Sequence, residues 1–202
     1  MDIDNATITY TPNYLSIEEA DDLFTSLSNL FTEEQKHIIT DDDNNKLYTL
    51  NRKTLVFIDN TINDHIIPKI WGKDVTILPF SSSLQELKLR LEQDLNFNFN
   101  ICLANYYNTG KNTIGWHSDN EEKGSTSCIA SISLGAERLF AFRKCNSKDI
   151  IKQMSLEHGS LLMMGKGCQE EYQHSLLADK TVRDPRLNLT FRLFDNQRYE
   201  NY

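Results

Sequence analysis

The segment Trp116-His117-Ser118-Asp119 places an imidazole and a carboxylate two residues apart. In an extended strand alternate side chains lie on the same face, so His117 and Asp119 can bind one small ion together. A third ligand must come from elsewhere in the chain, and the best candidate is His174. Two imidazoles and one carboxylate suit non-haem Fe(II) and leave coordination positions open for other ligands. The same three residues could also hold zinc for hydrolysis.

A second polar pattern lies in residues 184–194. Read at a period of two, this segment has one apolar face and one face of hydrogen-bond donors with an arginine at each end. The donor face consists of Arg186, Asn188, Thr190 and Arg192, and the apolar face consists of Leu187, Leu189, Phe191 and Leu193. A cationic donor face suits a small anion that carries carboxylates. Six residues of strand span about 20 Å, so the two arginines either converge, bind opposite ends of one molecule or have separate roles.

Taken in order, these motifs resemble those of the AlkB type of 2-oxoglutarate and Fe(II) dependent dioxygenases. That family has an Asn-x-Tyr strand, a His-x-Asp motif, a distal His and an Arg-x-Asn-x-Thr-x-Arg strand. The matching residues here are Asn105, Tyr107, His117, Asp119, His174, Arg186, Asn188, Thr190 and Arg192. The resemblance covers residues 97–194 closely and the first half of the chain loosely. It implies a double-stranded β-helix, or jelly roll, as the fold.

The resemblance also implies a role for each matching residue. His117, Asp119 and His174 would hold Fe(II), whose other positions take 2-oxoglutarate and then O2. The implied co-substrate residues are Asn105, Tyr107, Arg186, Asn188, Thr190 and Arg192. The implied reaction oxidises 2-oxoglutarate to succinate and CO2 and hydroxylates a methyl group. When that methyl group sits on a ring nitrogen, the product releases formaldehyde and leaves the repaired base.

The implied substrates are N-alkylated bases of the 1-methyladenine and 3-methylcytosine type, in DNA or RNA. These bases are cationic when alkylated, and Glu121 matches an acid that favours such a charge, whereas Asn120 stands where related repair enzymes often have Asp. Arg52 lies in a stretch that resembles the nucleotide-recognition segment of the family. Trp71 is the candidate for stacking on the damaged base, a contact that contributes about 1–3 kcal/mol.

Other functions are consistent with the same residues. A 2-oxoglutarate oxygenase that acts on proteins or small molecules would fit the acidic composition. A binding module with the same fold but no turnover is a further alternative, although the complete set of ligand positions argues against it. The cationic face of residues 184–194 favours iron and a 2-oxo acid over hydrolytic zinc.

The composition is that of one globular domain. The chain has 202 residues, of which 39% are hydrophobic and 25% charged, which is enough for a full core. No apolar run approaches the roughly 20 residues that cross a membrane, and residues 1–5 do not resemble a signal peptide. We therefore expect an intracellular monomer, in cytoplasm or nucleus, that does not bind membranes. The four cysteines lack Cys-x-x-Cys spacing and are expected to be reduced thiols.

The charge is distributed unevenly along the chain. The formal net charge is −8, but residues 1–50 contain eleven acids and two bases, whereas residues 51–202 contain eighteen acids and nineteen bases. A strongly acidic protein does not coat nucleic acid indiscriminately. The part that carries the motifs is nearly neutral, so contact with a phosphate backbone is compatible with the sequence.

The elements that position these motifs fall into two groups. Capping boxes at Ser16–Glu19 and Ser83–Glu86 predict helices over 16–30 and 83–95. Strands are predicted over 7–10, 50–57, 97–107, 114–119, 127–134, 138–143, 160–164, 172–176 and 186–194. We therefore predict an α+β class with a jelly-roll core and the N-terminal helices packed on one sheet. The single domain, residues 1–202, would comprise N-terminal helices with a nucleotide-recognition segment (1–96) and a jelly-roll catalytic core (97–194).

Overall fold

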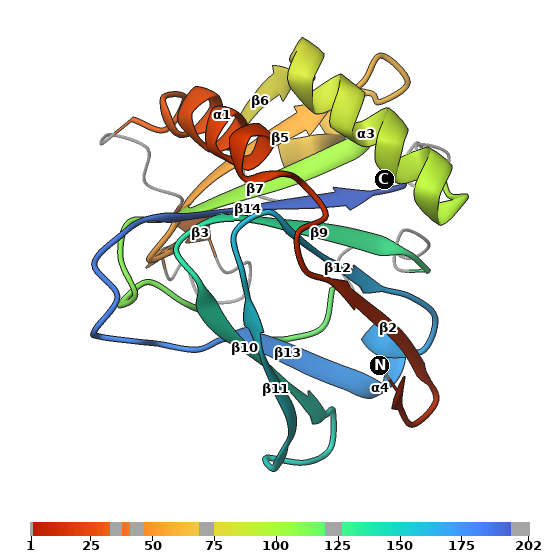
Figure 1. Ribbon diagram of the computed structural model, residues 1–202, viewed down its shortest axis with the longest axis vertical. Coiled ribbons are helices and arrows are strands. Elements are labelled where there is room, and N and C mark those ends of the chain that lie inside the picture. The colour runs from red at the N-terminus through yellow and green to blue at the C-terminus, as the bar shows by residue number, and fades with distance from the viewer. Residues whose placement is uncertain (1, 33–37, 41–46, 69–74, 120–126, 195–202) are drawn as a thin grey trace.

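The computed structural model of the chain describes residues 2–32, 38–40, 47–68, 75–119 and 127–194. Within these residues the strands form a larger sheet of eight strands and a smaller sheet of four (Figure 1). The larger sheet contains, in spatial order, β1 (Asp2–Ile3), β2 (Ala6–Thr11), β12 (Ser160–Met164), β9 (Ile129–Gly135), β14 (Arg186–Arg192), β7 (Ile101–Tyr107), β5 (Lys53–Ile58) and β6 (Thr76–Pro79). The smaller sheet contains β11 (Ile150–Leu156), β10 (Arg138–Lys144), β13 (Tyr172–Leu176) and β8 (Ile114–His117).

The other described elements are short or helical. They are the β3 (Ile38–Thr40) and β4 (Leu47–Thr49) pair, α1 (Ile17–Ser28), the 3-10 turn η1 (Asp64–Ile66), α3 (Ser82–Leu95) and α4 (Cys168–Glu171). None of the helices in this part of the chain is both long and apolar enough to cross a membrane. The coarse prediction of a mixed α and β protein with a sheet-rich core and few helices is confirmed.

Both long helices pack on the outer face of the larger sheet (Figure 1). Their buried leucines share one core cluster with the side chains of β14, β7 and β9 that point the same way. From β14 these are Leu187, Leu189 and Phe191, each fully buried. Because strand side chains alternate, the polar residues of β14 must point to the opposite face, toward the smaller sheet. The predicted two-faced strand is therefore what orients the candidate site.

The first capping box is present and the second is not. The Ser16 hydroxyl accepts from the Glu19 amide at 3.2 Å, and the Ser16 amide donates to the Glu19 carboxylate at 2.8 Å. The prediction of a box at Ser83–Glu86 was wrong, because α3 is capped by the Ser81 hydroxyl, which accepts from the Leu84 amide at 3.3 Å. Three consecutive serines offer three possible caps, and the sequence pattern alone does not distinguish among them.

Several strand boundaries differ from the predicted ones. β7 begins at 101 rather than 97, because the Phe97 and Phe99 amides donate to Glu92 and hold residues 97–99 against the end of α3. β8 ends at His117, two residues early. β6, which pairs in parallel with β5, and β11, the exposed edge strand of the smaller sheet, were not predicted. Neither sequence shows the alternation of a half-buried strand, so periodicity could not find them.

Candidate active site

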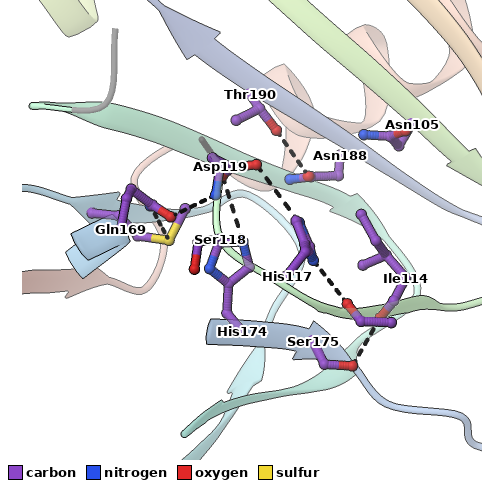
Figure 2. A network of polar contacts seen from close by, with 12 residues as sticks. Asn105, Ile114, His117, Ser118, Asp119, Gln169, His174, Ser175, Asn188 and Thr190 are labelled. Atoms are coloured by element: carbon purple, nitrogen blue, oxygen red, sulfur yellow. Dashed lines mark hydrogen bonds and ion pairs between the residues drawn. The ribbon is translucent and has the colours of Figure 1, made fainter. Parts of the chain in front are cut away.

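The three predicted metal ligands lie together where β8 and β13 pair (Figure 2). His174 is directly opposite His117 in this antiparallel pair, and the two ring centroids are 4.3 Å apart. The Asp119 carboxylate faces both rings. Its Oδ1 is 3.6 Å from Nε2 of His117 and its Oδ2 is 3.5 Å from Nε2 of His174. The possible ligand atoms all lie within 4.8 Å of one another, as a single ion requires.

The hydrogen bonding of His117 directs its other nitrogen to a metal ion. Nδ1 is 2.8 Å from the Gly115 carbonyl oxygen. A carbonyl only accepts, so Nδ1 carries the proton of the neutral ring and Nε2 presents its lone pair toward Asp119. Metal-bound histidines are commonly oriented by a hydrogen bond of this kind. Two imidazole nitrogens and one carboxylate arranged in this way fit iron(II).

Burial keeps His174 in its neutral form. The residue is 2% exposed, and its ring stacks on Phe140 with centroids 5.3 Å apart. Desolvation by this burial lowers the pKa of His174 below 6.5, although Asp119 acts in the opposite direction. Nδ1 of His174 has no hydrogen-bond partner among the described residues. A neutral imidazole is the form that ligates a metal ion.

Asp119 is fixed by contacts from two other elements. Nη2 of Arg192, at the end of β14, donates to Oδ1 of Asp119 at 3.0 Å, and both side chains are buried. The Asp119 amide donates to the side-chain carbonyl of Gln169 in α4 at 2.9 Å. Burial alone would raise the pKa of Asp119, but the Arg192 guanidinium and both histidines hold it well below 3.8. The carboxylate is therefore ionised and oriented before any metal ion binds.

The other end of β14 has a different electrostatic environment. Arg186 is 2% exposed, and its Nη2 donates to the Ser133 hydroxyl at 2.8 Å. Its guanidinium lies over the ring of Tyr107, 5.6 Å from the centroid, because the two residues are paired across β14 and β7. No carboxylate of the described residues forms an ion pair with it. Burial lowers the pKa of Arg186 to about 10, so it remains cationic at neutral pH.

Asn105, opposite Asn188 on β7 and β14, is oriented by donors from β5 and the residue before it. Its Oδ1 accepts from Nε of Arg52 at 2.8 Å and from the Thr54 hydroxyl at 3.2 Å. An amide whose oxygen is occupied by two donors keeps its NH2 group for an acceptor elsewhere. That Nδ2 donates to none of the described residues, so it is available to a bound oxygen. Arg52, predicted as a substrate contact, thus contacts a predicted co-substrate residue.

Asn188 and Thr190 are largely engaged within the sheet. Nδ2 of Asn188 donates to the Ser131 hydroxyl at 2.8 Å and to the Ile132 carbonyl at 3.0 Å. The Thr190 hydroxyl donates to Oδ1 of Asn188 at 3.1 Å. Figure 2 shows Asn105, Asn188 and Thr190 on the same side as the metal ligands. Asn188 and Thr190 therefore shape the polar face of β14, and direct contact of either residue with the co-substrate stays a prediction.

The remaining predicted residues lie outside the described part of the chain. They are Trp71, Asn120 and Glu121.

Sequence reasoning missed Gln169 and Arg138, both buried and both bonded to the segments that carry the ligands. No periodicity or motif marks either one, because the groups that they contact in the ligand-bearing segments are backbone amides and carbonyls, which every residue other than proline possesses.

Comparison with known proteins agrees with this geometry. Residues 7–192 match the family model of the 2OG-Fe(II) oxygenase superfamily. Alpha-ketoglutarate-dependent dioxygenase alkB homolog 3 of Bos taurus is 31% identical over 90% of this chain and 64% of its own length. DNA oxidative demethylase ALKBH2 of Mus musculus is 38% identical over 60% of this chain and 54% of its own length. A solved structure of OsALKBH1 superposes with a TM-score of 0.60 at 18% identity, covering 95% of this chain and 99% of that one.

The chain spans less than two thirds of the length of the curated relatives named here. Its family match nevertheless covers nearly the whole sequence. The superfamily uses Fe(II), 2-oxoglutarate and O2, which confirms the cofactors expected from the motifs. The chain therefore belongs to the 2OG-Fe(II) oxygenase superfamily, as a member of the AlkB type.

Proposed function

We propose that this protein oxidatively demethylates N-alkylated bases of the 1-methyladenine and 3-methylcytosine type in DNA or RNA. The reaction consumes one O2 and one 2-oxoglutarate and yields succinate, CO2, formaldehyde and the repaired base. Iron(II) held by His117, Asp119 and His174 would supply the oxidising chemistry. The fold that carries this site is proposed to be a jelly roll formed by the two sheets.

The buried Arg186 guanidinium is the observation that carries the proposal. A buried cation is costly unless an anion compensates it, and no described carboxylate does so. Arg186 lies at one end of the polar face of β14, and the metal ligands lie at the other, beside Arg192. Six residues of strand span about 20 Å, so a five-carbon 2-oxo diacid bound at the metal would reach Arg186 only through the length of that arginine side chain. The distal carboxylate would bind Arg186 and Tyr107, and the 2-oxo acid end would bind at the metal.

The residues around the ligands would orient and shield the reaction. Arg192 keeps Asp119 ionised, and the Gly115 carbonyl keeps the proton of His117 on Nδ1. The NH2 group of Asn105 would donate to an oxygen of the 2-oxo acid. The side chains of Asp119 and His174 are nearly fully buried, whereas that of His117 is 25% exposed. We infer that the methylated base approaches from the His117 side, and that the buried side excludes water.

The substrate class rests on the relatives and on the predicted recognition residues. The relatives bear the names alkB homolog 3 and DNA oxidative demethylase. We propose that Glu121 and Asn120 contact the alkylated base and that Trp71 stacks on it. Extruding a paired base costs a few kcal/mol, and damaged or single-stranded sites cost less. An intracellular monomer that acts on alkylated nucleic acid is part of the same proposal.

The test is mass spectrometry of a short single-stranded oligonucleotide that carries one 1-methyladenine. It is incubated with the protein, Fe(II), ascorbate and 2-oxoglutarate. We expect the loss of one methylene mass together with equimolar succinate and formaldehyde. The oligonucleotide should keep its full mass when 2-oxoglutarate is omitted or when the His174→Ala variant is used in place of the natural protein.

Succinate formation without loss of the methylene mass would refute 1-methyladenine in that oligonucleotide as the substrate and direct the search to RNA, proteins or small molecules. Retention of activity by both Asp119→Ala and His174→Ala would refute the metal assignment.

A further inference from the structure

Residues 108–113 connect the predicted co-substrate strand β7 to the metal strand β8. The loop begins directly after Tyr107 and ends directly before Ile114, which lies three residues before His117. It is held from one side by Asn51, whose amide group exchanges hydrogen bonds with Thr113. On the other side it is held by Arg138, the first residue of β10. The position of this loop therefore sets how the two strands lie relative to each other.

Arg138 bonds to four backbone carbonyls at once. Its Nη2 donates to Gly110 at 3.0 Å, to Asn112 at 2.8 Å and to Leu177 at 2.7 Å, and its Nη1 donates to Thr109 at 3.3 Å. The side chain is 2% exposed, and no described carboxylate forms an ion pair with it. A buried guanidinium whose Nη groups bond only to carbonyls, and whose Nε has no partner among the described residues, is a costly feature, which calls for a reason beyond packing.

The four carbonyls belong to segments that meet at this point. Leu177 directly follows β13, the strand of His174. The Gly110 amide donates to the Val182 carbonyl, and the Asp179 amide donates to the Gly110 carbonyl. A Cβ at Gly110 would lie 1.9 Å from the Asp179 carbonyl oxygen, so the two segments are in the closest possible contact. The second segment then continues into β14 and Arg186.

Arg138 also lies within the electrostatic range of the proposed diacid anchor. Its positive charge contributes to lowering the pKa of Arg186, after the larger effect of burial. Tyr107 interacts electrostatically with both guanidiniums. Arg138 and Arg186 are thus two buried cations that interact with one phenol, and neither has an ion pair with a described carboxylate.

We propose that Arg138 is a positioning residue for the 2-oxo diacid, an inference that rests on the proposed co-substrate role of Arg186 and Tyr107. By joining the loop 108–113 to Leu177, it fixes the spacing between the metal ligands and the diacid anchor. Its charge adds to the positive potential that selects a second carboxylate. Arg138 therefore determines both the affinity for 2-oxoglutarate and the preference for that chain length.

The test measures binding of 2-oxoglutarate and of the one-carbon longer 2-oxoadipate to the Mn(II)-loaded protein by titration calorimetry. Arg138→Lys keeps the charge but cannot reach four carbonyls, and we expect it to weaken 2-oxoglutarate binding about tenfold, the loss of one hydrogen bond to a charged group. Arg138→Met should weaken 2-oxoglutarate binding further and bring the dissociation constants of 2-oxoglutarate and 2-oxoadipate closer together. Asn51→Ala, at an exposed residue that holds the same loop, should weaken binding about threefold.

The matched control is Leu23→Ala, a buried leucine of α1 on the opposite face of the larger sheet. It should lower the melting temperature but change neither dissociation constant nor their ratio. Should Arg138→Met not fold, Arg138→Lys and Asn51→Ala carry the comparison. Unchanged affinity and selectivity in those two variants would overturn the inference while leaving the proposed function intact. Absence of oligonucleotide demethylation in the natural protein would refute the proposed function, and the binding comparison would still stand.

Discussion

The two ends of β14 carry the same side chain in opposite electrostatic situations. Arg192 is buried in contact with Asp119, at 3.0 Å, and so its charge is compensated within the protein. Arg186 is equally buried, but the side chains that it contacts are the Ser133 hydroxyl and the Tyr107 ring, both neutral. Because unpaired buried charge is costly, the Asp119 carboxylate accounts for the burial of Arg192, and we propose that the carboxylate of a bound ligand accounts for that of Arg186.

On this proposal, the difference separates orientation of the Asp119 carboxylate from recognition of the co-substrate. Sequence analysis could not decide whether the two arginines converge on one acid. The structure shows that they have separate partners, six residues apart on one strand. Variants at the two ends should therefore have different signatures in stability and in co-substrate affinity.

Asp119→Ala should have the largest effect. It removes the oxygen ligand and leaves Arg192 buried without its anion, so turnover should fall to that of the metal-free protein. Breaking a buried pair costs about 3–5 kcal/mol in the free energy of unfolding. Equilibrium unfolding in urea, without metal, measures that loss. Asp119 would therefore contribute to stability as well as to metal binding, unlike a metal ligand whose removal leaves the fold unaffected.

The double variant Asp119→Ala with Arg192→Met sharpens the same point. Removing both charges should restore most of the stability but no turnover. A double variant as unstable as Asp119→Ala alone would mean that the ion pair is not what the single change breaks.

Arg186→Met should produce the reverse pattern. No carboxylate loses its partner, so the free energy of unfolding should stay unchanged or rise. The KM for 2-oxoglutarate should increase about 100-fold, because two charge-assisted hydrogen bonds of about 1.5 kcal/mol each are lost. In the natural protein, 2-oxoglutarate at 100 times its Kd should add about 2.7 kcal/mol of stability, and the variant should lose this increment. Destabilisation as large as that of Asp119→Ala would abolish the contrast between the two ends.

The sequence predicts the direction of β14 well and its partners poorly. Alternation alone places Leu187, Leu189 and Phe191 on one face, and the structure packs them under the helices. It does not reveal that Arg192 meets Asp119, because the two residues are 73 positions apart and only the packing of the smaller sheet, which contains β8, against the larger sheet, which contains β14, brings them together. The contacts of Arg138 could not be predicted from the sequence for a second reason. Its acceptors are main-chain carbonyls, which carry no sequence signal.

Acid should destabilise the metal end in two separate pH ranges. Burial lowers the pKa of His174 below 6.5, so the unfolded chain takes up the proton first as the pH falls. The contribution of His174 is therefore complete above pH 6.5 and is lost as the pH falls from 6.5 toward the lower folded pKa. That of Asp119 is complete above about 3.8 and is lost only below it.

Unfolding of the metal-free protein between pH 8 and 5 tests the first range. His174→Gln should flatten the decline below pH 6.5, and an unchanged slope would mean that another group titrates there.

The smallest expected effect is at Arg52, which links the predicted recognition segment to the predicted co-substrate residue Asn105. Arg52→Met removes one of the two donors that orient the Asn105 amide, and Thr54→Val removes the other. Each hydrogen bond contributes about 0.5–1.5 kcal/mol, so each variant should raise the KM for 2-oxoglutarate by a few-fold and leave the KM for the oligonucleotide unchanged. Steady-state kinetics with each substrate varied in turn separates the two constants. If Arg52 contacts the nucleic acid instead, Arg52→Met should raise the oligonucleotide KM while Thr54→Val does not. The Thr54 variant is thus the matched control, since it disturbs the same amide from a buried position that a nucleic acid cannot reach.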